Sequence, residues 1–159
     1  MATEICNHLV IGDGADCRIG RPEEIVVVHA CKDPCHRNAV GYSGRSLPTG
    51  HPNYLYLEDS GNLYLNIIDP PKPLFKIESF RKFIEFLDSH IGRVPVLIHC
   101  NEGRSRAPSL ALLYAAKRLG LYERGTFGDS KLLLQEKLPS YLPGLGISRF
   151  LADHWHDFD

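Results

Sequence analysis

The chain has 159 residues, a formal net charge of −1 at pH 7, and 43% apolar and 23% charged residues. These values are typical of one globular domain and exclude a collagen-like, disordered or membrane-spanning chain. A domain of this length buries about 68–70% of the surface that its unfolded chain exposes, so its core needs neither disulfide nor metal. We therefore expect a single domain over residues 1–159, with balanced charges that attract neither nucleic acid nor an anionic membrane.

The cysteine count also limits the classes of protein. There are five cysteines, an odd number, and the first residues show neither the basic segment nor the long apolar stretch of a secretory leader. Disulfide frameworks belong to oxidising compartments. We therefore expect a cytoplasmic protein in which at least one thiol is free.

The first half of the chain alternates apolar runs with turns. Residues 8–12 predict a first strand, and residues 24–30 a second, whose unbroken β-branched run favours burial on both faces. A long stretch rich in Gly, Pro and Ser follows over residues 31–53. Residues 54–57 and 63–68 then predict a hairpin around the polar turn 58–62.

The second half predicts helices around one more strand. Apolar residues at positions 77, 80, 84, 87 and 91 indicate an amphipathic helix, and residues 95–99 a short buried strand. Residues 107–119 are apolar almost all round, as in a helix enclosed by the domain. Two further helices are predicted over residues 126–138 and 145–155. This alternation predicts an α/β fold with a central, mostly parallel sheet flanked by helices.

The chemistry is concentrated between strand 95–99 and helix 107–119, where the chain reads His99-Cys100-Asn101-Glu102-Gly103-Arg104-Ser105-Arg106. Backbone N–H groups at a helix N-terminus bind phosphate, and the helix dipole adds about half a positive charge there. The same field stabilises a thiolate, which makes Cys100 a candidate nucleophile. Gly103 permits a sharp turn, and the planar fork of Arg106 can bind two phosphate oxygens. Taken singly, each residue has an ordinary structural explanation, whereas four fixed identities in this context favour chemistry.

This segment, with Pro108 after it, resembles the signature of the cysteine-dependent protein tyrosine phosphatase superfamily, and most of all the small dual-specificity phosphatases. The resemblance covers most of the chain, including the closing residues 142–144 and the apolar helix after them. It implies that Cys100 takes the phosphoryl group and that His99 helps to keep Cys100 ionised. It further implies a phosphate-binding loop whose members are Asn101, Glu102, Gly103, Arg104, Ser105 and Arg106.

The resemblance also implies a general acid about thirty residues before the nucleophile, on a loop after a strand. Asp69 follows the predicted strand 63–68 and precedes Pro70 and Pro71, which keep the backbone extended. A general acid donates its proton to the leaving oxygen and later takes one from water. The alternative for Asp69 is an ordinary Asp-Pro turn. Asp59, in the hairpin turn, is the weaker candidate.

One position departs from the family pattern. Most members have Ser or Thr directly after the loop arginine, where its hydroxyl donates a hydrogen bond to the cysteine sulfur, but this chain has Ala107. Loss of a hydrogen bond to a charged group costs about 1–3 kcal/mol, or about ten- to hundredfold in rate. We therefore predict slow hydrolysis of the phosphoenzyme. Ser105 is a candidate replacement, whereas Ser109 should point away along the helix.

Other polar residues near the loop have two interpretations. Arg104 is a second cation that could favour a clustered or doubly charged phosphate; alternatively it pairs with Glu102 or points into solvent. Tyr42, Arg45 and His51 are candidates for the substrate cleft, although such polar loops are usually solvated connections.

Residues 29–36 contain two histidines and two cysteines, which are zinc's preferred ligand types. No second ligand pair with zinc-finger spacing follows, so we expect no metal and no organic cofactor. Because parallel strands end at the same edge of a sheet, Cys31 or Cys35 could also approach Cys100 and form a reversible disulfide.

The resemblance thus implies a phosphatase that hydrolyses phosphotyrosine and phosphoserine or phosphothreonine through a cysteinyl-phosphate intermediate, acting as a monomer on phosphoproteins. Two alternatives stay open. One is a phosphate-recognition module with weak catalysis, which Ala107 favours. The other is the same chemistry on phosphoinositide or RNA 5′-phosphate groups.

Overall fold

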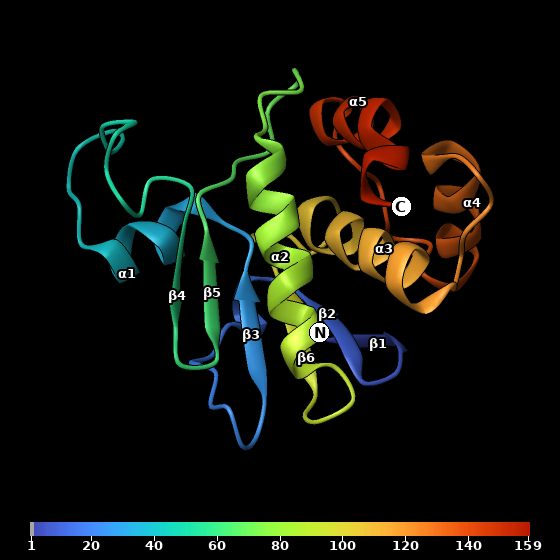
Figure 1. Ribbon diagram of the computed structural model, residues 1–159, viewed down its shortest axis with the longest axis horizontal. Helices are drawn as coiled ribbons and strands as arrows, with labels where there is room; N and C mark the ends of the chain where they lie inside the picture. Colours follow the sequence, from blue (N-terminus) through green and yellow to red (C-terminus); the bar gives the residue numbers. More distant parts are fainter. Residues whose placement is uncertain (1) are drawn as a thin grey trace.

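The computed structural model describes residues 2–159. One sheet contains six strands: β1 (Thr3–Cys6), β2 (Leu9–Gly12), β3 (Val26–His29), β4 (Tyr56–Asp59), β5 (Asn62–Leu65) and β6 (Val96–His99). They lie in the order β1-β2-β6-β3-β5-β4 (Figure 1). The four inner strands are parallel, and two antiparallel hairpins add β1 and β4 as the edges. The expected mostly parallel α/β sheet is confirmed.

Five α-helices accompany the sheet within the described part of the chain: α1 (Arg37–Val40), α2 (Ile77–His90), α3 (Arg106–Leu119), α4 (Phe127–Lys137) and α5 (Leu145–His154). In Figure 1, α2 crosses in front of the strands, and α3, α4 and α5 lie to its right. Helix α3 packs against β2, β6 and α2. None of the helices in residues 2–159 combines the length and apolar character needed to cross a bilayer.

Burial explains why these elements form. All four residues of β3 and all four of β6 are buried, as the two unbroken apolar runs predict. The apolar stripe of α2 is buried as well, and α3 is enclosed from Arg106 through Ala116. Because the first residues of α3 are buried, charges beside the positive end of its dipole interact more strongly than they would in bulk water.

The sheet register positions the candidate site. In the parallel ladder Gly12 of β2 pairs with His99 of β6, and His99 pairs with His29 of β3. The carboxyl ends of these three strands therefore meet at one edge of the sheet. In open α/β sheets this is the edge at which ligands bind.

Three short elements were not predicted. Strand β1 joins β2 through Asn7 and His8, which both adopt positive φ, 43° and 60°, without the glycine that usually signals such a turn. Within residues 31–53, where no helix or strand was predicted, a helical turn over Lys32–His36 leads into α1, and Gly41 ends that helix with a φ of 92°. A last 3-10 turn, Trp155–Phe158, follows α5.

Candidate functional site

The segment 100–106, called here the phosphate loop, joins β6 to α3. The Cys100 side chain is 2% exposed, and its Sγ accepts hydrogen bonds from the backbone N–H groups of Gly103 (3.3 Å) and Ala107 (3.4 Å). Gly103 has a φ of +72°, and a Cβ there would lie 3.0 Å from the carbonyl oxygen of Gly12. The turn that directs the amide of residue 103 at the sulfur therefore favours glycine. Both N–H groups stabilise negative charge on the sulfur.

The loop of the neighbouring strand supports the start of the phosphate loop. The N–H of Cys100 donates to the carbonyl of Gly12 (3.4 Å), and the N–H of Gly14 donates to the carbonyl of Asn101 (3.1 Å). The segment before α5 supports its other end: Leu142 N–H donates to the Arg104 carbonyl. Two segments distant in sequence thus fix the curvature of the loop.

Arg106 is 9% exposed and is held by two contacts. Its Nη1 donates to the Ile67 carbonyl (3.1 Å) and its Nη2 to Oδ1 of Asn101 (2.6 Å). Asn101 is oriented in turn by donating from Nδ2 to the Asp33 carbonyl (2.9 Å). The buried Nε of Arg106 has no hydrogen-bond partner within residues 2–159. A buried, unpaired guanidinium donor is costly, and an oxyanion in front of it would satisfy it.

A pocket of about 330 Å³ opens over the loop. Its lining combines loop residues with residues from two other segments: Asp69, Cys100, Asn101, Glu102, Arg104, Ser105, Arg106, Leu142 and Gly144. The structure therefore brings Asp69 to the pocket that holds Cys100 and Arg106. Asp69 packs closely on Gly144, because a Cβ at residue 144 would lie 2.5 Å from Oδ1 of Asp69. In the sequence, Gly144 is part of the closing segment 142–144 and carries no local signal that it contacts a carboxylate.

Several other candidates lie away from this pocket. Asp59 is the last residue of β4, beside the turn to β5, and lies at the opposite end of β5 from the edge where the strands before the phosphate loop end. Tyr42 bonds through its hydroxyl to His36, and the backbone carbonyl of Arg45 accepts from Lys32. His51 lines a separate hollow beside Tyr54 and Glu78. None of Tyr42, Arg45 and His51 lines the pocket over the phosphate loop, so their assignment to the substrate cleft stays a prediction.

The hydroxyl groups near Ala107 are both engaged elsewhere. Ser105 Oγ accepts from the N–H of Gly144 (2.8 Å), so it ties the loop to the segment before α5. Ser109 Oγ shares a hydrogen bond with the Tyr141 hydroxyl (2.8 Å), which confirms that it points away from the sulfur. Arg104 and Glu102 are exposed, and no ion pair joins them within the described chain.

His99 faces a different set of partners from those of Cys100. Its Nε2 lies 2.8 Å from Nδ1 of His29 and 3.9 Å from Sγ of Cys35. Burial lowers the pKa of His29 to about 4 and also lowers the pKa of His99, so both rings are neutral at pH 7. A neutral His99 adds no positive charge beside Cys100, so the predicted help in keeping Cys100 ionised cannot come from a charge on its ring.

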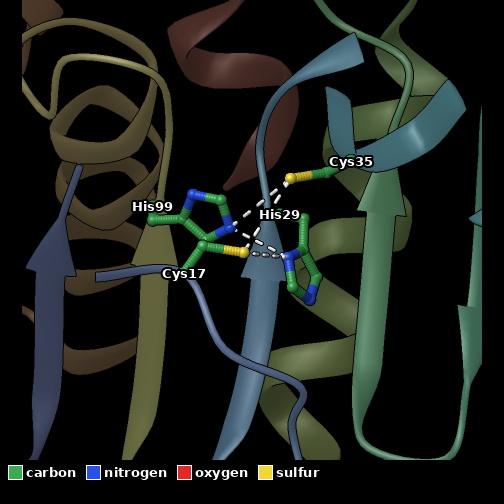
Figure 2. A group of neighbouring side chains, drawn as sticks. All are labelled: Cys17, His29, Cys35 and His99. Atoms are coloured by element: carbon green, nitrogen blue, oxygen red, sulfur yellow. Dashed lines mark hydrogen bonds between the residues drawn. The ribbon is translucent and has the colours of Figure 1, made fainter. Parts of the chain in front are cut away.

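The described residues that could hold a metal ion are Cys17, His29, Cys35 and His99, whose ligand atoms converge (Figure 2). Residues 29–36 were a candidate zinc segment in the sequence, but only His29 and Cys35 of that segment belong to this group. His36 instead bonds to Tyr42 and to the Asn53 carbonyl. The predicted disulfide between Cys31 or Cys35 and Cys100 stays a prediction.

Comparison with known proteins supports the resemblance. No family model matches the chain. A probable dual specificity protein phosphatase of Dictyostelium discoideum is 37% identical over 70 residues, 42% of this chain, and the match spans about a quarter (26%) of that relative. Among solved structures, the human tyrosine phosphatase-like serine/threonine/tyrosine-interacting protein has a TM-score of 0.67 at 18% identity, covering 99% of this chain and 97% of that one. DUSP15 has a TM-score of 0.64 at 19% identity, covering 99% and 90%. The chain has the fold of the dual-specificity phosphatases.

Proposed function

We propose that the protein is a cysteine-dependent phosphatase that hydrolyses phosphotyrosine and phosphoserine or phosphothreonine in proteins. The observation that carries the proposal is the meeting of Cys100, Arg106 and Asp69 in one pocket. These are the nucleophile, the phosphate-binding cation and the proton donor that such a reaction needs. The matching fold and the names of the similar proteins support this choice of substrate class.

In the first step the Cys100 thiolate attacks phosphorus and the bond to the leaving oxygen breaks. The phosphoryl oxygens are bound by the loop amides, by the unpaired Nε of Arg106 and by its fork. Asp69 gives its proton to the leaving alkoxide or phenoxide, which departs as an alcohol or phenol. The products of this step are the free hydroxyl compound and a cysteinyl-phosphate.

In the second step water attacks the phosphorus, Asp69 takes a proton from it, and the bond to Cys100 breaks. The sulfur leaves as a thiolate, stabilised by the N–H groups of Gly103 and Ala107. His99 is a positioning residue, because its ring is hydrogen-bonded to His29 of β3 and it ends β6 directly before Cys100. Inorganic phosphate leaves, and the protein returns to its starting protonation state.

The setting that we propose is a monomer in the cytoplasm. Five free cysteines support a reducing compartment. The exposed Leu142 in the pocket lining supports a pocket open to more than one type of phosphorylated side chain.

The test is phosphate release from an aryl phosphate, a phosphotyrosine peptide and a phosphothreonine peptide. We expect the unmodified protein to hydrolyse all three and Cys100→Ser and Arg106→Ala to be inactive on all of them. A phosphoinositide and a 5′-phosphorylated RNA are further arms of the same assay. Activity on one of these alone would overturn the protein-phosphatase proposal.

A phosphate-recognition module is the second candidate, because Ala107 offers the sulfur no hydroxyl. It predicts that the protein binds the phosphopeptides without releasing phosphate. Measuring binding and turnover on the same peptides therefore separates the two functions.

A further inference from the structure

Four metal-ligating side chains meet behind the phosphate loop, and the proposed phosphatase chemistry uses only the position of one of them. Cys17 comes from the loop after the turn Gly14–Asp16, His29 from the end of β3, Cys35 from the turn before α1, and His99 from the end of β6. Their Sγ, Nδ1, Sγ and Nε2 atoms all lie within 4.8 Å of one another. Figure 2 shows the four side chains pointing at one another.

The spacing of these atoms fits a tetrahedron around zinc. With Zn–S near 2.3 Å and Zn–N near 2.05 Å, a regular tetrahedron has edges of about 3.8 Å between sulfurs, about 3.6 Å between sulfur and nitrogen, and about 3.3 Å between nitrogens. The Cys17–Cys35 sulfurs are 4.0 Å apart, and two of the four sulfur–nitrogen pairs measure 3.7 and 3.9 Å. The other two pairs lie within 4.8 Å. The two histidine nitrogens, at 2.8 Å, share a hydrogen bond and need to separate by about 0.5 Å.

A second observation, outside the cluster, shows that His29 presents a lone pair to it. Asn62 donates from Nδ2 to the carbonyls of Gly20 and Asp59, and its Oδ1 accepts from the N–H of Gly20. The amide orientation is thereby fixed, so the Nε2 of His29, 3.0 Å from Oδ1, is the donor. The proton of His29 then sits on Nε2 and leaves Nδ1 bare. Metal-ligating histidines commonly donate their other N–H to an oxygen in this way.

We propose that Cys17, His29, Cys35 and His99 bind one Zn²⁺ ion in a closed tetrahedral site. Two thiolates and two imidazoles in tetrahedral arrangement are a donor set that favours zinc. On binding, the two thiols release two protons, and the proton of His99 moves from Nε2 to Nδ1. The filled site carries no net charge, because two thiolates balance the ion, and this suits its partial burial.

The site is structural rather than catalytic, because its four protein ligands leave no position for water or substrate. It joins two sheet strands to two loops, and His99 directly precedes Cys100. Zinc would therefore fix the end of the strand from which the phosphate loop departs. From the sequence no metal was expected, since the four ligands come from separate segments with no zinc-finger spacing, and this proposal departs from that expectation.

The proposal is independent of the phosphatase activity, so its test uses metal content and spectroscopy. The measurements are made under reducing conditions on Cys100→Ser, which removes the thiol of the pocket as a competing ligand. We expect one zinc per chain after gel filtration and, with Co²⁺ instead, the intense visible absorption of a tetrahedral cobalt thiolate. We also expect zinc to raise the melting temperature and to protect two thiols from a thiol reagent until a chelator is added.

Variants assign the ligands. In the same background, Cys17→Ser and Cys35→Ser should lose the stoichiometric metal and the cobalt spectrum, while Cys6→Ser, the matched control on β1, retains both. The cobalt spectrum needs no ligand variant, so a misfolded Cys17→Ser or Cys35→Ser would not obscure the result. If the reduced protein binds neither ion stoichiometrically, or if Cys17→Ser binds as well as Cys6→Ser, the site does not exist. Loss of two thiols on oxidation in Cys6→Ser, but not in Cys17→Ser or Cys35→Ser, together with no metal binding, would instead identify a Cys17–Cys35 disulfide pair.

Discussion

Arg106 is hydrogen-bonded to the carbonyl oxygen of Ile67, two residues before Asp69. The same carbonyl accepts the N–H of Lys32, at 3.0 Å. The segment that leads to Asp69, the proposed proton donor, thus holds the Arg106 guanidinium that would bind phosphate. Any substitution that breaks the planar fork should disturb both the binding of phosphate and the position of that segment.

Arg106→Lys should lower kcat by about a hundred- to a thousandfold, the usual effect of removing one preorganised donor to a developing charge. A lysine keeps the charge but cannot contact Ile67, Asn101 and a phosphate oxygen together. Steady-state kinetics on an aryl phosphate measures the effect. Arg118→Lys, at the far end of α3, is the matched control and should retain full activity. An unchanged kcat in Arg106→Lys would show that charge alone suffices.

Asp69→Asn should slow the reaction most for substrates whose leaving oxygen needs a proton to depart. We expect a loss of about 10²–10⁴ on phenyl phosphate or a phosphopeptide, because the leaving oxygen then departs without a proton. A nitrophenyl phosphate, whose leaving group needs no proton, should be affected far less. Asp59→Asn is the control and should behave as the unmodified protein. Equal losses on all substrates would indicate a structural role for Asp69.

Ala107→Ser should raise turnover about ten- to hundredfold if the second step limits the rate, because a serine hydroxyl would add a hydrogen bond to the leaving thiolate. Stopped-flow measurements on the unmodified protein should show a burst of leaving group followed by slow turnover. Ala111→Ser adds the same hydroxyl one turn later in α3, away from the sulfur, and should give no gain. Absence of the burst together with no gain in Ala107→Ser would contradict this prediction.

Gly144→Ala and Gly146→Ala should separate activity from stability. A Cβ at residue 144 meets the flexible carboxylate of Asp69, so the carboxylate should move, and activity should fall with little change in melting temperature. A Cβ at residue 146 would lie 2.2 Å from the backbone oxygen of Pro70, which should cost about 1–3 kcal/mol of stability. Gly128→Ala meets no atom within 4 Å and is the control for both. Thermal unfolding and aryl phosphate hydrolysis are the two measurements, and parallel effects at residues 144 and 146 would contradict the assignment.

The sequence was most informative where one local pattern determines the structure. The apolar run before Cys100 and the all-round apolar helix after Arg106 predicted the strand, the loop and the helix start together. Strand β1 was not predicted, because the turn that joins it to β2 has Asn7 and His8 at positive φ in place of glycine. The proximity of Cys17 to His99 was not predicted, because it depends on the sheet register and on the course of a loop, which no local spacing in the sequence encodes.

The contacts of Ser105 and Arg104 with the segment 142–144 have a consequence during synthesis. The chain is synthesised from its N-terminus, so Cys100 and Arg106 leave the ribosome well before Gly144 does. Until then the phosphate loop lacks its partners on one side, and Asp69 lacks the surface on which it packs. A nascent chain therefore contains Cys100 and Arg106 before it contains the residues that complete the pocket lining, and the pocket would be complete only after Leu142 and Gly144 have docked.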